Sequence, residues 1–282
     1  MPASITPMTH GGQVDLLSTQ KLIAWFRSHG CVGIVLAGTN GEGASLSAVE
    51  KRDLVKAAVP MAEWLPVILG VATPSLDEAV WSCEQARKAG AAAGLVMAPG
   101  FFREATDEGI AQWFESLLRQ TTLPLLPYNF PKRTGITFTP ELVARLAAHD
   151  GVAGFKDSSA NAANILDFAQ AAPGKRLYVG DETLLLSALE AGWSGTISGA
   201  SNSLSRWLVP VVSDWETDRE SSETKFAILK PKIEALRKCR QPVANKFALH
   251  RYGVIDDPSP KLPLLPLTEE EQSALWAIVS DV

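Results

Sequence analysis

Residues 152–159 read Val-Ala-Gly-Phe-Lys-Asp-Ser-Ser, a short apolar run that ends in a lysine and breaks into a small polar loop. The run is typical of a buried strand, and Lys156 stands at its end. Burial of a lysine costs stability and lowers its pKa, which leaves a neutral amine able to attack a carbonyl group. The same pattern fits a lysine that only marks where a strand emerges into solvent. The rest of the chain decides between these two interpretations.

The strand at Lys156 is one of eight short apolar runs, each followed by a helical pattern. The runs cover residues 4–8, 32–37, 66–71, 93–98, 123–129, 152–156, 177–180 and 195–198. Helix starts are marked by Ser18, a candidate N-cap, and by Ser47 and Glu50 at capping-box spacing. Eight strand–helix units favour a parallel (β/α)8 barrel, known as a TIM barrel, over an open doubly wound sheet.

Beyond the eighth strand the pattern becomes wholly helical, with segments near 205–215, 218–238, 242–252 and from 268 onward. We therefore expect an α/β fold in which residues 1–215 form the barrel. Residues 216–282 are predicted to be a helical C-terminal extension of the same domain.

Composition excludes several classes of protein. The chain has 282 residues, a net charge of −5 and 46% hydrophobic residues, so no basic surface points to nucleic acid or an anionic membrane. Its three cysteines lie far apart and form neither a disulfide framework nor a zinc site. No signal sequence or membrane-spanning run is visible. We expect a cytoplasmic protein without a membrane partner.

The ends of the predicted strands carry the polar residues that could do chemistry, because barrel active sites lie at that end. They are Thr6, Thr39 with Asn40, Tyr128, Lys156 and the Gly180-Asp181 turn. The glycine-flanked Thr39–Asn40 turn could hold a carboxylate on its backbone N–H groups, although most such turns are plain loops. Taken alone, Tyr128 is better explained as a core aromatic residue with a satisfied hydroxyl.

Together these groups suit Schiff-base chemistry on a 2-oxo acid. The amine forms an iminium that serves as an electron sink, and a hydroxyl moves protons while a C–C bond breaks or forms. The four histidines are scattered without metal-ligand spacing, which disfavours a metal-dependent aldolase. We expect neither a metal nor a cofactor beyond the covalent adduct on Lys156.

At this point the sequence resembles the dihydrodipicolinate synthase / N-acetylneuraminate lyase family, nearly from end to end. The motifs that carry the resemblance are Thr6-Pro7-Met8, Gly38-Thr39-Asn40-Gly41-Glu42, Tyr128-Asn129-Phe130-Pro131, Gly154-Phe155-Lys156-Asp157, Gly180-Asp181 and Gly195-Thr196-Ile197-Ser198. The resemblance implies a TIM barrel that acts on pyruvate or a pyruvate-yielding substrate. It also implies a homo-oligomer, either a dimer or a tetramer built from dimers.

The resemblance assigns roles to individual residues. Lys156 is similar to the Schiff-base lysine and Tyr128 to the residue that shuttles protons. Thr39 corresponds to the neighbouring hydroxyl, and the Thr39–Asn40 turn to the carboxylate site. The carbonyl of Ile197 is similar in position to one that lines the site, and Gly180 is a further candidate for substrate binding.

Two departures weaken the assignment as a true dihydrodipicolinate synthase. Such synthases usually have a second threonine where this chain has Asn40. Where this chain has Phe101-Phe102, they have a tyrosine that reaches in from a partner subunit. An amide cannot relay a proton as a hydroxyl does. Arg133 favours the synthase assignment, because it matches the synthase arginine that binds the carboxylate of the second substrate. It could hold such a group in bidentate fashion, or be an ordinary surface arginine.

Our first hypothesis is a pyruvate-dependent class I aldolase, a lyase that acts on a 4-hydroxy-2-oxo acid or related sugar acid. The alternative is 4-hydroxy-tetrahydrodipicolinate (dihydrodipicolinate) synthase, which condenses pyruvate with an aspartate-derived aldehyde. A third hypothesis, from a different class, is a non-catalytic sensor that binds a 2-oxo acid. It is the weakest, because a binder has no need of the nucleophile.

Overall fold

The computed structural model describes residues 1–280 of the chain. These residues fall into two compact units: residues 1–67 with 198–280 form the first unit, and residues 68–197 form the second. The predicted division at residue 215 lies inside the first unit, and the single domain with a C-terminal extension stays a prediction.

The second unit is built on parallel strands that pair in chain order, β2 to β6. The strands are β2 (Val67–Val71), β3 (Ala93–Met97), β4 (Leu125–Asn129), β5 (Gly154–Asp157) and β6 (Arg176–Val179), all within two residues of the predicted runs. Val67 itself belongs to the first unit. Nearly every residue of these strands is buried, as expected for strands whose two faces are both covered.

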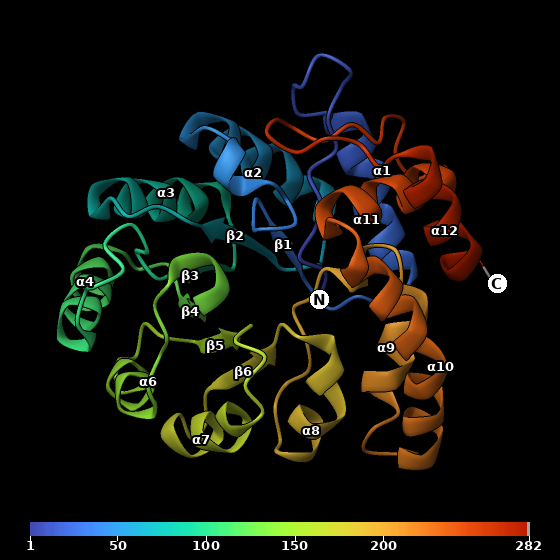
Figure 1. Ribbon diagram of the computed structural model, residues 1–282. Helices are drawn as coiled ribbons and strands as arrows, with labels where there is room; N and C mark the ends of the chain where they lie inside the picture. The colour runs from blue at the N-terminus through green and yellow to red at the C-terminus, as the bar shows by residue number, and fades with distance from the viewer. Residues whose placement is uncertain (281–282) are drawn as a thin grey trace. The chain divides into compact units, whose positions relative to one another are not determined.

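Helices follow the strands of the second unit, and those labelled in Figure 1 lie along the outer side of the sheet. They are α3 (Leu76–Ala89), α4 (Asp107–Gln120), α5 (Pro131–Thr134), α6 (Pro140–Ala147), α7 (Ala163–Ala171) and α8 (Leu185–Glu190), with the 3-10 turn η2 (Glu182–Leu184). Half of these α-helices begin at a side-chain cap, such as Thr106 before α4 and Thr139 before α6, each of which accepts from the N3 amide. Phe114 of α4 meets Phe138 edge to face, with ring centroids 5.9 Å apart.

The first unit contains β1 (Ile34–Leu36) and two shorter parallel pairings, between Pro2 and Ser198 and between Ala3 and Val35. The predicted first strand, residues 4–8, is therefore displaced toward the N-terminus. It ends early because Met8 pairs antiparallel with Val14, which turns the chain back. The predicted last strand, residues 195–198, is likewise reduced to isolated bridges.

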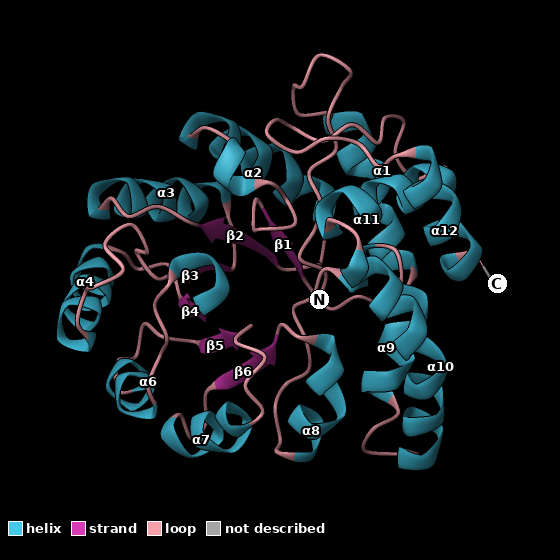
Figure 2. Ribbon diagram, viewed as in Figure 1, coloured by secondary structure: helices cyan, strands magenta, loops and turns pink. Residues whose placement is uncertain are grey.

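The remaining helices belong to the first unit, and Figure 2 shows how much of the chain around them is helical. They are α1 (Leu16–Ser28), α2 (Ala48–Ala62), α9 (Ser205–Ser213), α10 (Arg219–Lys238), α11 (Gln241–Arg251) and α12 (Glu269–Val279), with the 3-10 turns η1 (Gly43–Ser45) and η3 (Ala200–Asn202). The cap of α1 is Asp15, not the predicted Ser18, because the Asp15 carboxylate accepts from the amides of Leu17 and Ser18. The predicted capping box at Ser47 and Glu50 is confirmed.

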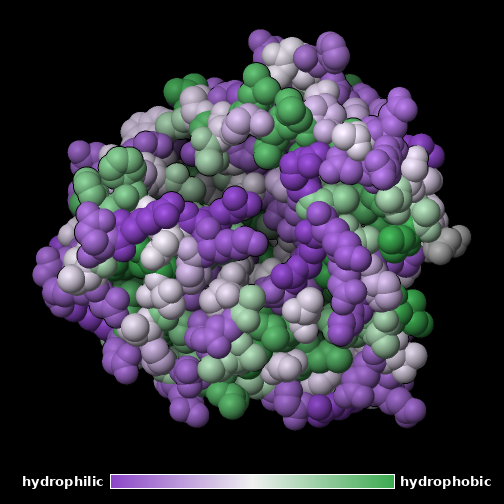
Figure 3. All heavy atoms as spheres, in the orientation of Figure 1, coloured by the Kyte–Doolittle hydropathy of each residue, from purple (hydrophilic) through white to green (hydrophobic). Residues whose placement is uncertain are grey.

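The surface agrees with the mixed polar and apolar composition. The face shown in Figure 3 is largely hydrophilic, with hydrophobic side chains in separate patches. Among the described residues, no helix has both the length and the apolar character needed to cross a membrane.

Candidate active site

The second unit brings the predicted lysine and tyrosine together. In the parallel register Tyr128 of β4 lies beside Lys156 of β5, and Lys156 lies beside Tyr178 of β6. The three residues are 4%, 5% and 7% exposed. Lys156 therefore does not emerge into solvent where its strand ends. It is a buried lysine, as the first of the two interpretations of the sequence expects.

The Nζ atom of Lys156 lies over the ring of Tyr128, 4.3 Å from the ring centroid. Within the described residues, Lys156 has no carboxylate at ion-pair distance and donates no hydrogen bond to a protein group. Buried lysines are normally paired, so this one is unusual. A nucleophile without a partner does not have to break an interaction before it attacks a carbonyl carbon.

A serine that the sequence analysis did not single out completes this group. The Tyr128 hydroxyl and Ser158 Oγ are 3.2 Å apart, a hydrogen bond in which either group can donate. Gly180 makes room for both side chains, because a Cβ at that position would overlap Ser158 Oγ and come within 2.9 Å of Lys156 Cε. The sign of this role in the sequence was the position of Ser158, two residues beyond Lys156 in the polar loop.

A polar network holds the loop that follows Lys156. The buried carboxylate of Asp157 accepts hydrogen bonds from Asn129 Nδ2 (2.6 Å), Ser159 Oγ (2.7 Å) and Asn164 Nδ2 (3.4 Å). Asn129 also accepts from the Phe138 amide, which ties the ends of β4 and β5 to the chain before α6. Burial raises the pKa of the Asp157 carboxyl, although hydrogen bonds from Ser159 and Asn129 oppose this effect. Successive strand residues point to opposite faces, so the network braces the loop from the side away from Lys156.

The other residues predicted for the second unit lie as follows. Ile197 is fully buried, and its amide donates to the Val179 carbonyl at 3.2 Å. Arg133 is an exposed residue of the short helix α5, with its guanidinium carbon 6.0 Å from the Phe130 ring centroid. Phe101 and Phe102 are 75% and 63% exposed and touch edge to face, so these two positions present no hydroxyl.

Thr39 and Asn40 lie in the first unit, in the tight turn that follows β1. Thr6 Oγ1 donates to the Gly41 carbonyl at 2.7 Å, and the Gly43 amide donates to the Gly38 carbonyl at 3.0 Å. Thr39 Oγ1 and Asn40 Oδ1 are buried without any hydrogen-bond partner. Buried polar atoms are rarely left unpaired, so these two indicate a place where a ligand supplies the partner.

A buried ion pair beneath this turn was not foreseen from the sequence. Lys246 Nζ of α11 lies 2.5 Å from Glu42 Oε1, and the two side chains are 0% and 1% exposed. The ammonium donates its hydrogen bond to the Ser259 carbonyl at 2.9 Å, while Glu42 Oε2 accepts from the Lys261 amide. Burial lowers the pKa of Lys246, and the charge of Glu42 opposes this effect. A helix position more than two hundred residues away gives no local sign of this pairing.

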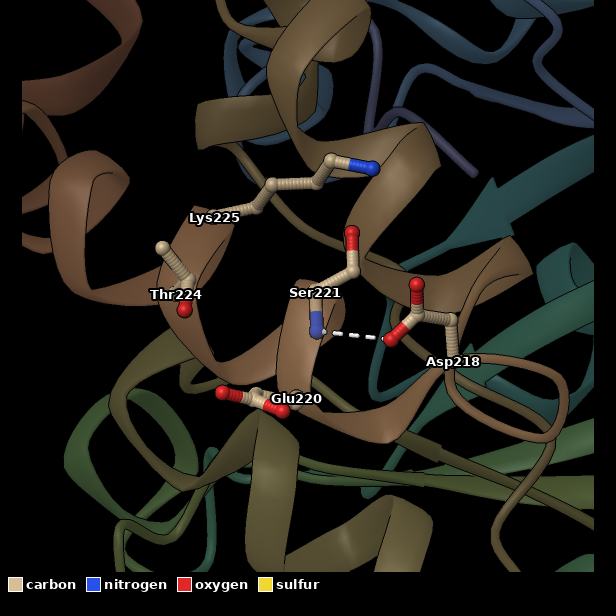
Figure 4. A pocket seen from close by; sticks show the side chains of 5 residues that line it. All are labelled: Asp218, Glu220, Ser221, Thr224 and Lys225. Carbon is tan, nitrogen blue, oxygen red and sulfur yellow. Dashed lines mark hydrogen bonds between the residues drawn. The ribbon is translucent and has the colours of Figure 1, made fainter.

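One hollow of the first unit contains none of the predicted site residues. A hollow at the start of α10 is lined by Asp218, Glu220, Ser221, Thr224 and Lys225, and Figure 4 shows the Asp218 carboxylate accepting from the Ser221 amide as a helix cap. In residues 1–280, no group of three or more His, Cys, Asp and Glu side chains is placed to hold a metal ion.

The comparisons with known proteins agree along the whole chain. The model of the dihydrodipicolinate synthetase family matches residues 1–282. The 4-hydroxy-tetrahydrodipicolinate synthase of Archaeoglobus fulgidus is 33% identical over 284 residues, which cover 100% of this chain and 97% of that protein.

Solved structures show the same fold. A dihydrodipicolinate synthase of Bacillus anthracis has a TM-score of 0.94 at 26% identity, covering 100% of this chain and 97% of that one. The dihydrodipicolinate synthase of Acinetobacter baumannii, solved with pyruvate, has a TM-score of 0.94 at 30% identity, covering 99% and 97%. This likeness confirms the predicted (β/α)8 barrel with a C-terminal helical part.

Proposed function

This chain belongs to the dihydrodipicolinate synthetase family, and we propose that it forms a Schiff base between Lys156 and the 2-oxo group of pyruvate. It is a lyase of the class I aldolase kind, since enzymes of this family work through a lysine Schiff base with pyruvate and need no cofactor. The observation that carries the choice of lysine is the buried Nζ without an ionic partner, 4.3 Å from the centre of the Tyr128 ring.

The proposed reaction begins when the neutral amine of Lys156 attacks C2 of pyruvate, and one proton of its nitrogen passes to the former carbonyl oxygen to give a neutral carbinolamine. Tyr128 gives its hydroxyl proton to the resulting carbinolamine oxygen, the C–O bond breaks, and water leaves as the iminium forms. The Tyr128 phenolate then takes a proton from C3, which converts the iminium into an enamine and restores the hydroxyl. The Ser158 hydroxyl, 3.2 Å away, stabilises the phenolate between these two transfers.

Other residues bind the substrate in this proposal. The Thr39 hydroxyl and the backbone amides of Thr39 and Asn40 hold the pyruvate carboxylate, and Thr39 also assists the proton transfers. The buried Thr39 hydroxyl without a partner, and the two amides that donate to no acceptor in the described residues, support this role. Gly180 and the Ile197 carbonyl line the pyruvyl group, and the exposed Arg133 meets an acid group on the second substrate.

The enamine then attacks an aldehyde, and the relatives favour one such partner. We propose condensation with an aspartate-derived semialdehyde, the reaction of a 4-hydroxy-tetrahydrodipicolinate synthase. The name of the Archaeoglobus fulgidus relative supports this alternative better than our first hypothesis. Arg133 supports it too, because the semialdehyde carries a carboxylate that a guanidinium could bind.

Cleavage of a 4-hydroxy-2-oxo acid remains the second candidate. It is favoured by Asn40, which is an amide where synthases use a hydroxyl, and by Phe101 and Phe102, which supply no phenol. A sensor that binds a 2-oxo acid without turnover is the third candidate. The predicted homo-oligomer and the predicted cytoplasmic location stay predictions.

Intact-mass analysis after borohydride reduction tests the proposal. We expect a pyruvate adduct on the wild-type chain and none on Lys156→Ala. Lys132→Ala, which removes an exposed lysine near the end of β4, is the matched control and should form the adduct normally. A well-folded wild-type protein that gives no adduct would overturn the proposal and leave the sensor first.

The second step of the test identifies the acceptor. Pyruvate with aspartate semialdehyde should be consumed by the wild type if the synthase reaction is correct. Retro-aldol release of pyruvate from 4-hydroxy-2-oxoglutarate, without consumption of the semialdehyde, would instead establish the aldolase.

A further inference from the structure

The turn at residues 38–43 rests on charges that the proposed reaction does not use. Glu42 is part of the turn, and Lys246 reaches it from α11 with Nζ 2.5 Å from Oε1. The other carboxylate oxygen of Glu42, Oε2, accepts a hydrogen bond from the Lys261 amide at 2.5 Å. The carboxylate is thus held from both sides by parts of the chain that are far away in sequence.

The backbone of this turn is strained and tightly packed. Ala37 and Glu42 have φ angles of 53° and 55°, the left-handed region that residues with a Cβ avoid. The turn has no space for a side chain at its glycines. A Cβ on Gly43 would overlap the Ala37 carbonyl, and a Cβ on Gly41 would lie 2.9 Å from the Ser4 carbonyl. Such strained residues persist only where the surroundings enforce them, and they cluster at functional sites.

The strained turn leaves polar groups free at its tip. Thr39 Oγ1 and Asn40 Oδ1 have no partner, and the backbone amides of Thr39 and Asn40 donate to no acceptor in the described residues. Consecutive free amides with an adjacent hydroxyl form a concave site for an anion. A relaxed turn would bond these groups internally, so the strain and the open site belong together.

We propose that Glu42 and Lys246 form a positioning pair, which keeps the turn in its strained conformation and thereby sets the affinity for the pyruvate carboxylate. The pair does not touch the substrate, and its effect passes through Thr39 and Asn40. This inference rests on the proposed function, since it assigns the pair to the binding of the same pyruvate.

Three variants separate positioning from a general loss of stability. Glu42→Asp keeps both charges but withdraws the carboxylate by one methylene group, so it carries the smallest folding risk. The double variant Glu42→Gln/Lys246→Met removes both charges and leaves neither one unpaired in the core. Asp256→Asn breaks an exposed ion pair with Lys21 in the same unit and serves as the control.

The measurement is the pyruvate dependence of borohydride-trapped adduct, together with the adduct fraction at saturation. We expect half-saturation to require about ten to a hundred times more pyruvate in Glu42→Asp and in the double variant, the cost of a small misplacement of binding groups. The fraction at saturation should match the wild type, because Lys156 is untouched. Asp256→Asn should match the wild type in both quantities.

The outcomes are distinct. A folded Glu42→Asp variant with half-saturation within twofold of the wild type would overturn the inference, whether or not the double variant folds. A lower saturating fraction with unchanged half-saturation would also overturn it, since that result indicates loss of folded protein only. Absence of adduct in the wild type would overturn the proposed function and this inference with it.

Discussion

Replacing Ser158 by alanine removes the hydroxyl that lies 3.2 Å from the Tyr128 hydroxyl. The backbone should stay in place, because the Ser158 amide donates to the Asn129 carbonyl at 2.9 Å whatever the side chain is. The substitution therefore isolates one hydrogen bond at the group that is proposed to move protons.

The size of the effect follows from the charge on Tyr128. A hydrogen bond between neutral groups contributes about 1 kcal/mol, and one to a charged group about 1.5–3 kcal/mol. The difference, about 0.5–2 kcal/mol, is the stabilisation that Ser158 gives only while Tyr128 is a phenolate. Since about 1.4 kcal/mol corresponds to tenfold in rate, Ser158→Ala should slow proton transfer by about two- to thirtyfold.

The assay is deuteration of the pyruvate methyl group in D2O, followed by NMR, with no aldehyde present. This exchange requires the enamine and so reports removal of the C3 proton. Adduct trapped by borohydride at subsaturating pyruvate reports the iminium separately, and it should fall in Ser158→Ala as well, because the iminium exists only while Tyr128 is a phenolate. Tyr128→Phe should slow exchange more, and adding Ser158→Ala to it should have no further effect.

Two results would refute this reasoning. One is exchange in Ser158→Ala within twofold of the wild type. The other is an additive loss in the double variant, since a serine that acts through the tyrosine has no effect once the phenol is gone. Ser159→Ala is the matched control, because its hydroxyl braces Asp157 and should affect thermal stability instead.

Three further predictions follow from the same geometry. Gly180→Ala should reduce trapped adduct more than tenfold at fixed pyruvate, because the new Cβ would overlap Ser158 Oγ and crowd Lys156 Cε; normal adduct formation would contradict the packing. Burial raises the pKa of the Cys83 thiol to about 12, so mass spectrometry after iodoacetamide treatment at pH 8 should find Cys83 unmodified until the protein is unfolded. The pKa of Asp157 is raised above its ordinary 3.8, so the unfolded chain releases this proton first as pH rises. Urea titrations should therefore show the free energy of unfolding of the wild type falling, relative to Asp157→Asn, from pH 3.8 up to the raised pKa, and a rise would refute the sign.

The sequence by itself determined the strand–helix alternation and the position of Lys156. Both are local properties: the apolar runs at residues 67–71, 93–97 and 125–129 became strands because their length and composition suit a buried parallel sheet. Capping boxes such as Ser47 with Glu50 are equally local, and the helix formed where they predicted.

Local signals failed where a competing local bond or a distant partner prevailed. Ser18 had the right residue type for a cap, but Asp15 caps α1 with a stronger acceptor, its carboxylate. Residues 4–8 looked like a strand, yet the pairing of Met8 with Val14 bends the chain away from it.

Only the tertiary structure decided which polar groups meet. The register of β4, β5 and β6 sets Tyr128 beside Lys156, and the packing against Gly180 directs Ser158 toward the phenol. The pairing of Glu42 with Lys246 joins a turn to a helix that follows about two hundred residues later. Sequence patterns encode periodicity and propensity along the chain, whereas the partners of a buried charge depend on how distant segments pack.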